Sequence, residues 1–357
     1  MTDARSRELQ RFDPELPLER AWTAPASWYV EPEFQALERE RVFRSNWIAV
    51  ARTEAVAAPQ SYVAGELCGA PWVVVRDAEG ELRAFHNVCR HHATAVAEGS
   101  GRCEQLVCAY HGWTYDLDGA LRSAPQLGRV EDFRREDFGL KPLAVTSWRK
   151  LVYVHFGTPT HEPADELRAL SHELDLLDSL GLRFVERKRY ELDCNWKVYV
   201  DNYLDGGYHV PHLHGGLDAS LDMAQYENEL FESYNVQRCP GARDQRVGQK
   251  ALYAWLYPNL MINRYGQMLD VNRVLPLAPD RCAVEFEWYA APEVDGATLA
   301  RWLGDSERVQ REDEDVCASV QRGLASGAYD RGRYAQREAP MHHFHCLLHA
   351  DLSRAEA

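Results

Sequence analysis

The sequence predicts an α+β fold, with an all-β domain in its N-terminal part and a larger domain that mixes helices with strands. Two observations predict it. Short runs of β-branched and aromatic residues, separated by turn residues, fill the segment from Trp47 to about Phe156. Helical leucine spacing, further strand-like runs and a long charged helix then follow. We place an N-terminal arm and helix at 1–45, the all-β domain at 46–157 and the larger domain at 158–357.

The N-terminal elements follow from proline positions and apolar spacing. The first thirty residues are interpreted as an irregular arm because prolines interrupt them. A helix is expected to begin at Pro32, a residue suited to the first helical position, and to end near Phe43. The clearest strands expected in the all-β domain are 72–76, 82–86 and 151–156.

The larger domain is expected to follow a proline-containing linker at 157–165. A helix over about 165–180 comes first, because its leucines recur at helical spacing. Residues 196–214 are interpreted as a helix that a Gly-Gly pair breaks and that ends near Pro211. The remaining expected elements are strands over 184–192, 259–264, 269–275 and 282–290 and a closing helix over about 297–324.

Charge and cysteine content exclude several classes of function. The formal net charge of −15 argues against nucleic acid as a partner, because phosphates require a basic surface. It is compatible with a cationic substrate, although solubility explains it more simply. The odd count of nine cysteines argues against a disulfide framework. Since no apolar run could span a membrane and the N-terminus lacks the apolar core of a signal peptide, we expect a cytoplasmic protein without a membrane partner.

One motif pairs each of two cysteines with a histidine. Cys89 and His91 are followed, after sixteen residues, by Cys108 and His111. A zinc finger pairs Cys with Cys and His with His, whereas a Rieske [2Fe-2S] cluster takes two thiolates on one iron and two imidazoles on the other. The motif therefore predicts a Rieske cluster bound by these four residues.

The alternatives for this motif are weaker. Structural zinc would use the same four residues but would not require the mixed Cys-His pairs. His86 and His92 lie nearby and are interpreted as neighbours of the cluster that do not bind it. The other seven cysteines match no ligand spacing and are expected to be small buried apolar residues.

A second group of candidate ligands lies in the segment DNYLDGGYHVPHLHG. It contains Asp205, His209, His212 and His214. Two histidines and a carboxylate that leave coordination positions open suit a non-haem Fe(II) that must also bind O₂. Three histidines beside an acid, in a chain that already carries a redox cluster, therefore predict a second metal site.

The third ligand of that site is expected to be an acid from elsewhere in the chain. The closing helix offers four consecutive acids, Glu312, Asp313, Glu314 and Asp315. Asp313 lies four residues after Val309 and four before Cys317, so it falls on the side of the helix that faces the core. The others are interpreted as a solvated charge run, and the spacing favours Asp313.

These two motifs, in this order, resemble those of the Rieske non-haem iron oxygenases, and specifically of their large catalytic subunit, the alpha subunit. The resemblance runs from ASWYVEPEFQALERERVFRSNWIAVAR to APMHHFHCLLHADL and so covers nearly the whole chain. The segment DNYLDGGYHVPHLH is most similar to the choline monooxygenase branch, whose members oxidise quaternary ammonium compounds.

The resemblance implies a Rieske β-domain followed by a helix-grip domain, in which an antiparallel sheet wraps a long helix. It implies His209, His214 and Asp313 as the ligands of the mononuclear iron. It also implies that Asp205 links an iron histidine to a cluster histidine of the neighbouring subunit, in a head-to-tail ring that is usually a trimer. Many members place this acid three residues before the first histidine ligand, whereas Asp205 lies four before it, so Asp201 is kept as the alternative.

The resemblance implies a route for electrons as well. No G-x-G-x-x-G segment follows a strand, so NAD(P)H is expected to bind a separate flavin/iron–sulfur reductase. Electrons would pass from the cluster through His91 or His111, and then through Asp205, to the iron that activates O₂. One oxygen atom would enter a C–H bond of the substrate. An N-methyl substrate would then lose formaldehyde, and a choline-like alcohol would become an aldehyde hydrate.

The substrate is the least constrained part of this prediction. A quaternary ammonium compound such as choline or a betaine requires an aromatic cage. The candidate cage residues are Tyr203, Trp255, Tyr257 and Trp288, with Tyr208 and Tyr289 as further choices. Aromatic residues at strand positions more often belong to the core. The alternatives are an oxygenase that hydroxylates an aromatic ring or a natural product and, in another class, a Rieske electron carrier, which would have no use for the histidines at 209–214.

Overall fold

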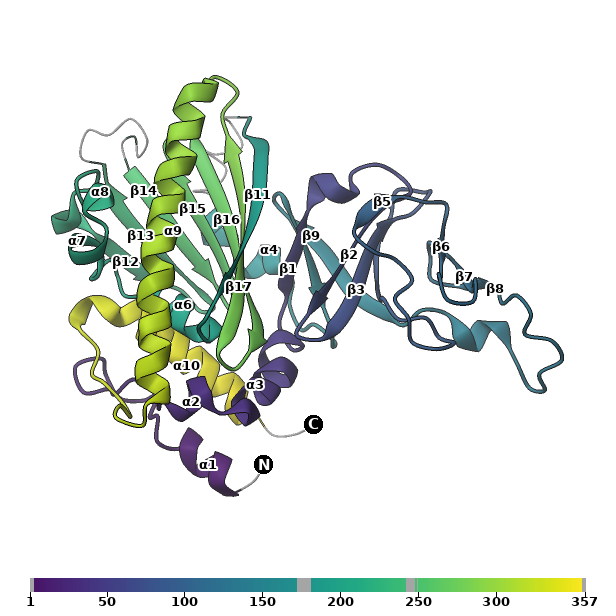
Figure 1. The fold of residues 1–357 in the computed structure, drawn as a ribbon, viewed down its shortest axis with the longest axis horizontal. Helices are drawn as coiled ribbons and strands as arrows, with labels where there is room; N and C mark the ends of the chain where they lie inside the picture. Colours follow the sequence, from purple (N-terminus) through teal and green to yellow (C-terminus); the bar gives the residue numbers. More distant parts are fainter. Residues whose placement is uncertain (1–2, 172–180, 242–247, 249, 355–357) are drawn as a thin grey trace. The chain divides into compact units, whose positions relative to one another are not determined.

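The structure is a computed structural model, and it describes residues 3–171, 181–241, 248 and 250–354. The chain divides into two compact units (Figure 1). One comprises residues 43–165, and the other combines residues 1–42 with residues 166–357. The boundaries expected from the sequence fall after residues 45 and 157. Among the described residues, no helix has both the length and the apolar character needed to cross a membrane.

The unit of residues 43–165 is built mainly of antiparallel β-strands. Its main sheet has seven strands in the order β1-β10-β9-β4-β3-β2-β5, and a smaller sheet has the order β6-β7-β8. The strands are β1 (Ile48–Arg52), β2 (Ser61–Leu67), β3 (Ala70–Arg76), β4 (Leu82–His86), β5 (Ser100–Arg102), β6 (Gln105–Val107), β7 (Thr114–Asp116), β8 (Leu121–Ser123), β9 (Pro142–Trp148) and β10 (Leu151–His155). Short 3₁₀ turns form η2 (Thr53–Val56) and η3 (Arg135–Phe138).

The strands expected in this unit are confirmed. The segments 72–76, 82–86 and 151–156 correspond to β3, β4 and β10. Val73 and Val75 of β3 and Phe85 of β4 enter a core cluster that also contains the thiols of Cys89 and Cys108. The two loops that carry the Cys-His pairs are therefore anchored in the core through their cysteines.

The second unit is built on an antiparallel seven-stranded sheet in the order β11-β17-β16-β15-β14-β13-β12. The strands are β11 (Arg183–Leu192), β12 (Glu227–Leu230), β13 (Tyr234–Pro240), β14 (Lys250–Leu256), β15 (Leu260–Tyr265), β16 (Met268–Ala278) and β17 (Arg281–Ala290). The long helix α9 (Gly296–Ala325) crosses one face of this sheet (Figure 1), and α6 (Trp196–Tyr203) contacts both α9 and β16. The α+β class and the long helix over an antiparallel sheet are thus confirmed.

The other helices among the described residues are short, apart from the last. They are α1 (Asp3–Leu9), α2 (Ser27–Val30), α3 (Pro32–Glu38), the π-helical turn η1 (Arg39–Phe43), α4 (Pro163–Glu166), α7 (Val210–Leu213), α8 (Gly215–Asp218), the 3₁₀ turns η4 (Met223–Gln225) and η5 (Gln336–Glu338), and α10 (Ala339–Ser353). The helix expected from Pro32 to about Phe43 is confirmed as α3 followed by η1. Residues 172–180 of the helix expected over 165–180 lie outside the described residues.

Several local expectations are wrong, for physical reasons. The N-terminal arm contains α1, because its prolines come only after Leu9. Pro211 lies in the first turn of α7 rather than at the end of a helix, since a proline loses no hydrogen bond there. Strands β12 to β14 and helix α10 were not expected, because buried polar residues such as Asn235 and the histidines of α10 obscure the apolar periodicity.

Buried polar contacts fix helix α6, which leads into the second group of candidate ligands. The Lys197 ammonium donates to Glu38 Oε1 at 2.5 Å, and the indole N–H of Trp196 donates to Glu38 Oε2 at 2.7 Å. Asn195 caps the helix, because its side-chain oxygen accepts a hydrogen bond from the Lys197 backbone N–H at 3.0 Å. All four residues are buried, so the start of α6 has one well-defined position.

Candidate metal centres and substrate cavity

Two loops of the all-β unit carry the Cys-His pairs. The first follows β4, and the second connects β6 to β7. They close with the same hydrogen bond: the backbone N–H of Cys89 donates to the Thr94 carbonyl at 2.8 Å, and that of Cys108 donates to the Trp113 carbonyl at 2.8 Å. The two loops therefore hold their cysteines in equivalent positions.

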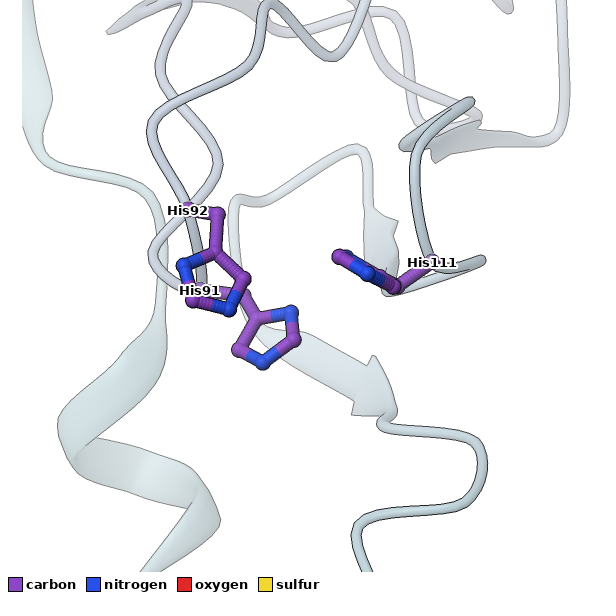
Figure 2. A group of neighbouring side chains, drawn as sticks. All are labelled: His91, His92 and His111. Atoms are coloured by element: carbon purple, nitrogen blue, oxygen red, sulfur yellow. The ribbon is translucent and has the colours of Figure 1, made fainter.

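The loops bury both thiols and leave the imidazoles near the surface. Cys89 and Cys108 are buried, His91 is half-buried and His111 is exposed. Figure 2 shows His91 and His111 reaching toward each other from the two loops, with ring centroids 4.7 Å apart and His92 beside His91. In the described part of the chain, His91 Nδ1 is buried and has no hydrogen-bond partner. Two buried thiols and an unpaired imidazole nitrogen form a donor set that fits a Rieske cluster.

Tyr115 contacts one of these loops at its cysteine. Its hydroxyl oxygen lies 3.3 Å from Cys89 Sγ and accepts the backbone N–H of Arg90 at 2.9 Å. Burial and the hydrogen bond with Cys89 raise the pKa of Tyr115, so the hydroxyl keeps its proton. With its oxygen already accepting from Arg90, the O–H is directed to donate to the sulfur.

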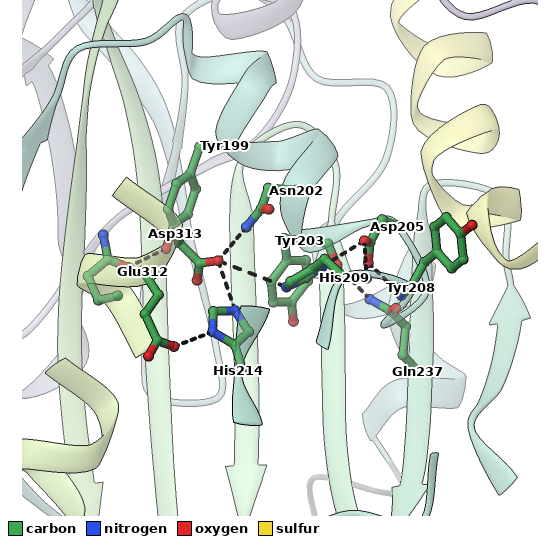
Figure 3. A network of polar contacts seen from close by, with 11 residues as sticks. Tyr199, Asn202, Tyr203, Asp205, Tyr208, His209, His214, Gln237, Glu312 and Asp313 are labelled. Carbon is green, nitrogen blue, oxygen red and sulfur yellow. Dashed lines mark hydrogen bonds and ion pairs between the residues drawn. The ribbon is translucent and has the colours of Figure 1, made fainter. Parts of the chain in front are cut away.

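In the second unit, three residues predicted as ligands come together from two elements. His209 and His214 flank α7, and Asp313 lies in α9. Asp313 Oδ1 is 3.0 Å from His214 Nε2 and 3.9 Å from His209 Nε2. Ligand atoms of all three lie within 4.8 Å of one another, and Figure 3 shows their side chains converging. This donor set, with two imidazoles and one carboxylate on one side of a cavity, fits a mononuclear iron with open positions.

Two glycines explain the spacing between Asp205 and His209. Gly206 and Gly207 both have positive φ, at 68° and 72°, which favours glycine over other residues. A Cβ at Gly206 would overlap the backbone carbonyl of Arg337, and one at Gly207 would crowd Met223. The tight turn directs the Asp205 side chain back toward His209.

Asp205 is bound to His209 by several contacts. Its Oδ2 lies 2.6 Å from His209 Nδ1 and accepts the backbone N–H of His209 at 2.8 Å. Its Oδ1 accepts the backbone N–H of Tyr208 at 3.1 Å. A carboxylate at Nδ1 keeps the proton on that nitrogen and leaves Nε2 free to bind a metal. Asp201, the alternative acid, instead accepts the Tyr29 hydroxyl at 2.6 Å and lies 2.9 Å from His345 Nε2.

Two further residues, Glu312 and Asn202, contact the candidate iron ligands His214 and Asp313. Glu312 Oε2 lies 2.6 Å from His214 Nδ1, and the Asn202 amide N–H donates to Asp313 Oδ1 at 2.8 Å (Figure 3). Burial alone lowers the pKa of His214, but the carboxylates of Asp313 and Glu312 outweigh it and raise the pKa overall. The same negative carboxylates that favour a proton on His214 would also attract a metal cation.

A cavity of about 820 Å³, including the solvent at its mouth, opens beside His209, His214 and Asp313. Its aromatic lining residues are Tyr199, Tyr203, Tyr226, Tyr253, Tyr265 and Phe286. Burial raises the pKa of Tyr203 and Tyr226 well above the ordinary value, so these rings stay neutral. Strands β14, β15 and β16 supply much of the wall through side chains that alternate toward the same face.

Comparison with known proteins assigns both parts of the chain to known domains. The Rieske [2Fe-2S] domain matches residues 46–134, and the catalytic domain of the ring hydroxylating alpha subunit matches residues 179–353. The chain is 45% identical to the chloroplastic choline monooxygenase of Arabidopsis thaliana, over 97% of its own length and 87% of that protein. The chain belongs to the Rieske oxygenases as an alpha subunit.

Other relatives of this alpha subunit include enzymes named for quaternary ammonium substrates and one named for an aromatic substrate. The oxygenase subunit of carnitine monooxygenase from Acinetobacter pittii is 29% identical over 87% of each chain. A solved quaternary ammonium Rieske monooxygenase, studied for carnitine oxidation and inter-subunit electron transfer, has a TM-score of 0.86, with 26% identity over 95% of this chain and 99% of that one. Naphthalene 1,2-dioxygenase from Rhodococcus, at 19% identity and a TM-score of 0.81, shows the shared fold.

Membership establishes what kind of protein this alpha subunit is. It is an oxidoreductase, and its cofactors are a Rieske [2Fe-2S] cluster and a mononuclear iron, with O₂ as co-substrate and an external reductase. The catalytic-domain match over residues 179–353 goes against a Rieske electron carrier, which would lack such a domain. Structural zinc at the Cys-His motif is likewise excluded by the Rieske match.

The structure separates the predicted cage residues of the alpha subunit. Tyr203 lines the cavity, whereas Trp255, Tyr257 and Trp288 are not among its described lining residues. Trp255 packs edge-on against Phe344 of α10 at 5.2 Å between centroids. The Tyr257 hydroxyl donates to Asp351 at 2.7 Å. Trp255 and Tyr257 pack in the core because α10, which was not expected from the sequence, covers this end of β14.

Sequence reasoning also missed residues that contact the predicted ligands. Glu312 was interpreted as part of a solvated charge run, yet its carboxylate reaches His214. Glu312 and Asp313 are neighbours on α9, and helical spacing does not predict that both would contact His214. Tyr115 lies 26 residues from Cys89 in sequence, so only the fold brings them together.

His92 and His86 were expected to be neighbours of the cluster. The centroid of the His92 ring lies 4.0 Å from that of His91, and the His86 ring packs against Phe156 with centroids 5.8 Å apart.

Replacing Tyr115 by phenylalanine is expected to lower the reduction potential of the Rieske cluster. A hydrogen bond to a ligand sulfur stabilises the more negative, reduced cluster. Loss of one such bond, at about 1.4 kcal/mol, corresponds to a shift on the order of 60 mV for one electron. A redox titration followed by visible absorption measures it. Tyr110→Phe is the matched control, since Tyr110 is exposed beside His111, and an equal shift in both variants would contradict the role of Tyr115.

Proposed function

We propose that this enzyme monooxygenates a quaternary ammonium compound such as choline or a betaine. The observation that carries the proposal is the aromatic cavity beside His209, His214 and Asp313. Tyr203, Tyr226 and Tyr253 line it, and neutral aromatic rings bind a quaternary ammonium group, which carries no N–H. The relatives in the choline and carnitine monooxygenase groups act on such compounds, which supports the same substrate class here.

The cofactor ligands follow from the two donor sets. We propose that Cys89, Cys108, His91 and His111 hold the cluster, and that His209, His214 and Asp313 hold the mononuclear iron. When bound, the two groups supply electron transfer and O₂ activation. The protein contributes the rest: Glu312 and Asp205 orient the two imidazoles, and Asn202 orients Asp313. Domain limits of 46–157 for the Rieske domain and 158–357 for the catalytic domain, with 1–45 as the arm and helix, remain part of the proposal.

We propose Asp205 as the bridge for electrons between subunits of a head-to-tail homotrimer. Asp205 contacts His209 on one side and lines a separate surface recess on the other, together with Asp201 and Tyr29. A histidine of another subunit could reach Asp205 from that recess. The solved relative studied for inter-subunit electron transfer supports this arrangement. Light scattering of the purified protein tests it, and a monomer with full activity would contradict it.

We also propose that the enzyme works in the cytoplasm with a separate NAD(P)H-dependent flavin/iron–sulfur reductase. All nine cysteines are free of disulfides, as expected in a reducing compartment. The plant relatives are chloroplastic, so the location of this chain is best tested directly, by fractionation of the cells that make it.

The function is tested by oxygen uptake. The purified enzyme, loaded with iron and supplied with a surrogate reductase and NADH, is given choline, glycine betaine or carnitine. We expect substrate-dependent O₂ consumption with at least one of them, with one oxygen atom entering a C–H bond and the other leaving as water. Betaine aldehyde as product indicates attack at the alcohol carbon, and formaldehyde indicates attack at an N-methyl group. No uptake with any of the three, by an enzyme whose cluster is reduced, would contradict the proposed substrate class.

A further inference from the structure

A chain of hydrogen bonds runs along the cavity wall on β15 and β16. The Tyr203 hydroxyl donates to Asn263 Oδ1 at 2.6 Å, and Asn263 Nδ2 donates to Asp270 Oδ1 at 2.8 Å. Asn272 Nδ2 donates to the same Asp270 oxygen at 2.9 Å. Asn263 and Asp270 are directly opposite in the β15–β16 pair, and Asn272 is two residues further along β16, on the same face. All of these residues line the cavity.

This chain determines which way the Asn272 amide points. Asn263 and Asn272 both donate to the same oxygen, Asp270 Oδ1, so the group that Asn272 presents to Asp270 is its NH₂. Its carbonyl oxygen Oδ1 must then point elsewhere. That oxygen is buried and has no hydrogen-bond partner within the described ranges, although Asn272 is only 3% exposed and lines the cavity.

An unpaired acceptor at this place requires an explanation. Leaving a buried polar atom without a partner is unfavourable, and most such atoms in folded proteins are paired. In Asn263 both the side-chain oxygen and the NH₂ group have hydrogen-bond partners, whereas in Asn272 only the NH₂ group has one among the described residues. Because Asn272 lines the space that the substrate would fill, a donor on a bound substrate is the partner that its Oδ1 lacks in the described part of the chain.

We propose that Asn272 is a specificity-determining residue whose Oδ1 accepts a hydrogen bond from a hydroxyl group of the substrate. This rests on the proposed function and narrows it. A quaternary nitrogen carries no N–H, so the donor must come from elsewhere in the molecule, and an alcohol supplies it. A carboxylate placed there would put acceptor against acceptor. The cavity therefore selects hydroxyl-bearing ammonium compounds of the choline type over glycine betaine.

The test compares two ligands that differ only in the hydroxyl group. Choline and ethyltrimethylammonium are titrated calorimetrically into the anaerobic, iron-loaded enzyme, for the wild type and for Asn272→Leu. We expect the wild type to bind choline more tightly. We expect Asn272→Leu to weaken choline binding by about 5- to 100-fold, the range for a lost partner of a buried polar group, and to leave ethyltrimethylammonium binding nearly unchanged.

Asn235→Leu is the matched control. Asn235 is also a fully buried asparagine of the same sheet, and neither polar atom of its side chain has a partner within the described residues. It is not among the described residues that line the cavity. We expect it to leave the ratio of the two affinities unchanged, which separates contact with the ligand from a general effect of replacing a buried asparagine.

Several outcomes would overturn the assignment of Asn272. They are equal binding of the two ligands by the wild type, equal weakening of both by Asn272→Leu, and a changed ratio in Asn235→Leu. If Asn272→Leu does not fold, Asn272→Ala removes the same oxygen and takes its place, and equal binding of the two ligands by the wild type overturns the assignment without any variant. Binding does not depend on turnover: a wild type that prefers choline but never oxidises it contradicts the proposed function and leaves the role of Asn272 supported.

Discussion

Asp313→Ala is expected to remove the mononuclear iron and to abolish substrate oxidation, while the Rieske cluster stays intact. Asp313 supplies the only carboxylate oxygen of the ligand group among the described residues, 3.0 Å from His214 Nε2. Without it, two neutral imidazoles remain, and these bind Fe(II) less tightly than a set that includes an anionic oxygen. Even residues that only support a metal ligand cost about 10- to 100-fold when replaced, so loss of a ligand should cost at least about 100-fold.

The measurement is metal and sulfide content together with the visible spectrum. The wild type should contain the two irons and two sulfides of the cluster and one further iron, and the variant should lose only that further iron. Asp315→Ala is the control, because Asp315 is an exposed acid on the same helix. If Asp313→Ala kept its full iron content and oxidised substrate at the wild-type rate, Asp313 would not be a ligand.

The sequence was most informative where the chemistry depends on residues close together in the chain. Cys89 and His91 lie two residues apart, and Cys108 and His111 lie three apart, so one short motif carries each half of the cluster site. The segment with His209 and His214 is equally local. Asp313 lies 99 residues from His214, and helical spacing alone could only favour it. The family resemblance then placed it in the ligand group.

What the sequence could not show depends on contacts between distant strands and helices. The predicted cage was taken from aromatic residues at strand positions, but strand periodicity gives only the face, not the depth along the strand. Tyr253 and Trp255 share a face of β14, yet Tyr253 lines the cavity and Trp255 packs against Phe344. Trp255 is covered by helix α10, which was not expected from the sequence, and Tyr253 is left to line the cavity. The orientation of the Asn272 amide depends likewise on Asp270 and Asn263, which pair only once the sheet has formed.

Asp205→Asn is expected to slow substrate oxidation by about 10- to 100-fold or more while most of the mononuclear iron remains bound. The asparagine has the same shape, but it lacks the negative charge that faces His209 Nδ1 at 2.6 Å. His209 then loses the partner that holds its proton, and electrons lose a charged bridge between cluster and iron. The decisive measurement is the rate of cluster oxidation in a single turnover, because it reports electron transfer separately from substrate binding.

Asp201→Asn separates the two acids that the sequence left as alternatives. Asp201 accepts a hydrogen bond from Tyr29 and lies beside His345, whereas Asp205 contacts His209 directly. If Asp205 is the bridge, Asp201→Asn should oxidise its cluster at close to the wild-type rate, and only Asp205→Asn should be slow. The reverse result would move the bridge to Asp201 and would mean that the Gly206-Gly207 turn, which adds a residue between acid and histidine, has displaced Asp205 from that role. Because both variants keep the size of the side chain, a difference between them reports charge at one position and not a general loss of packing.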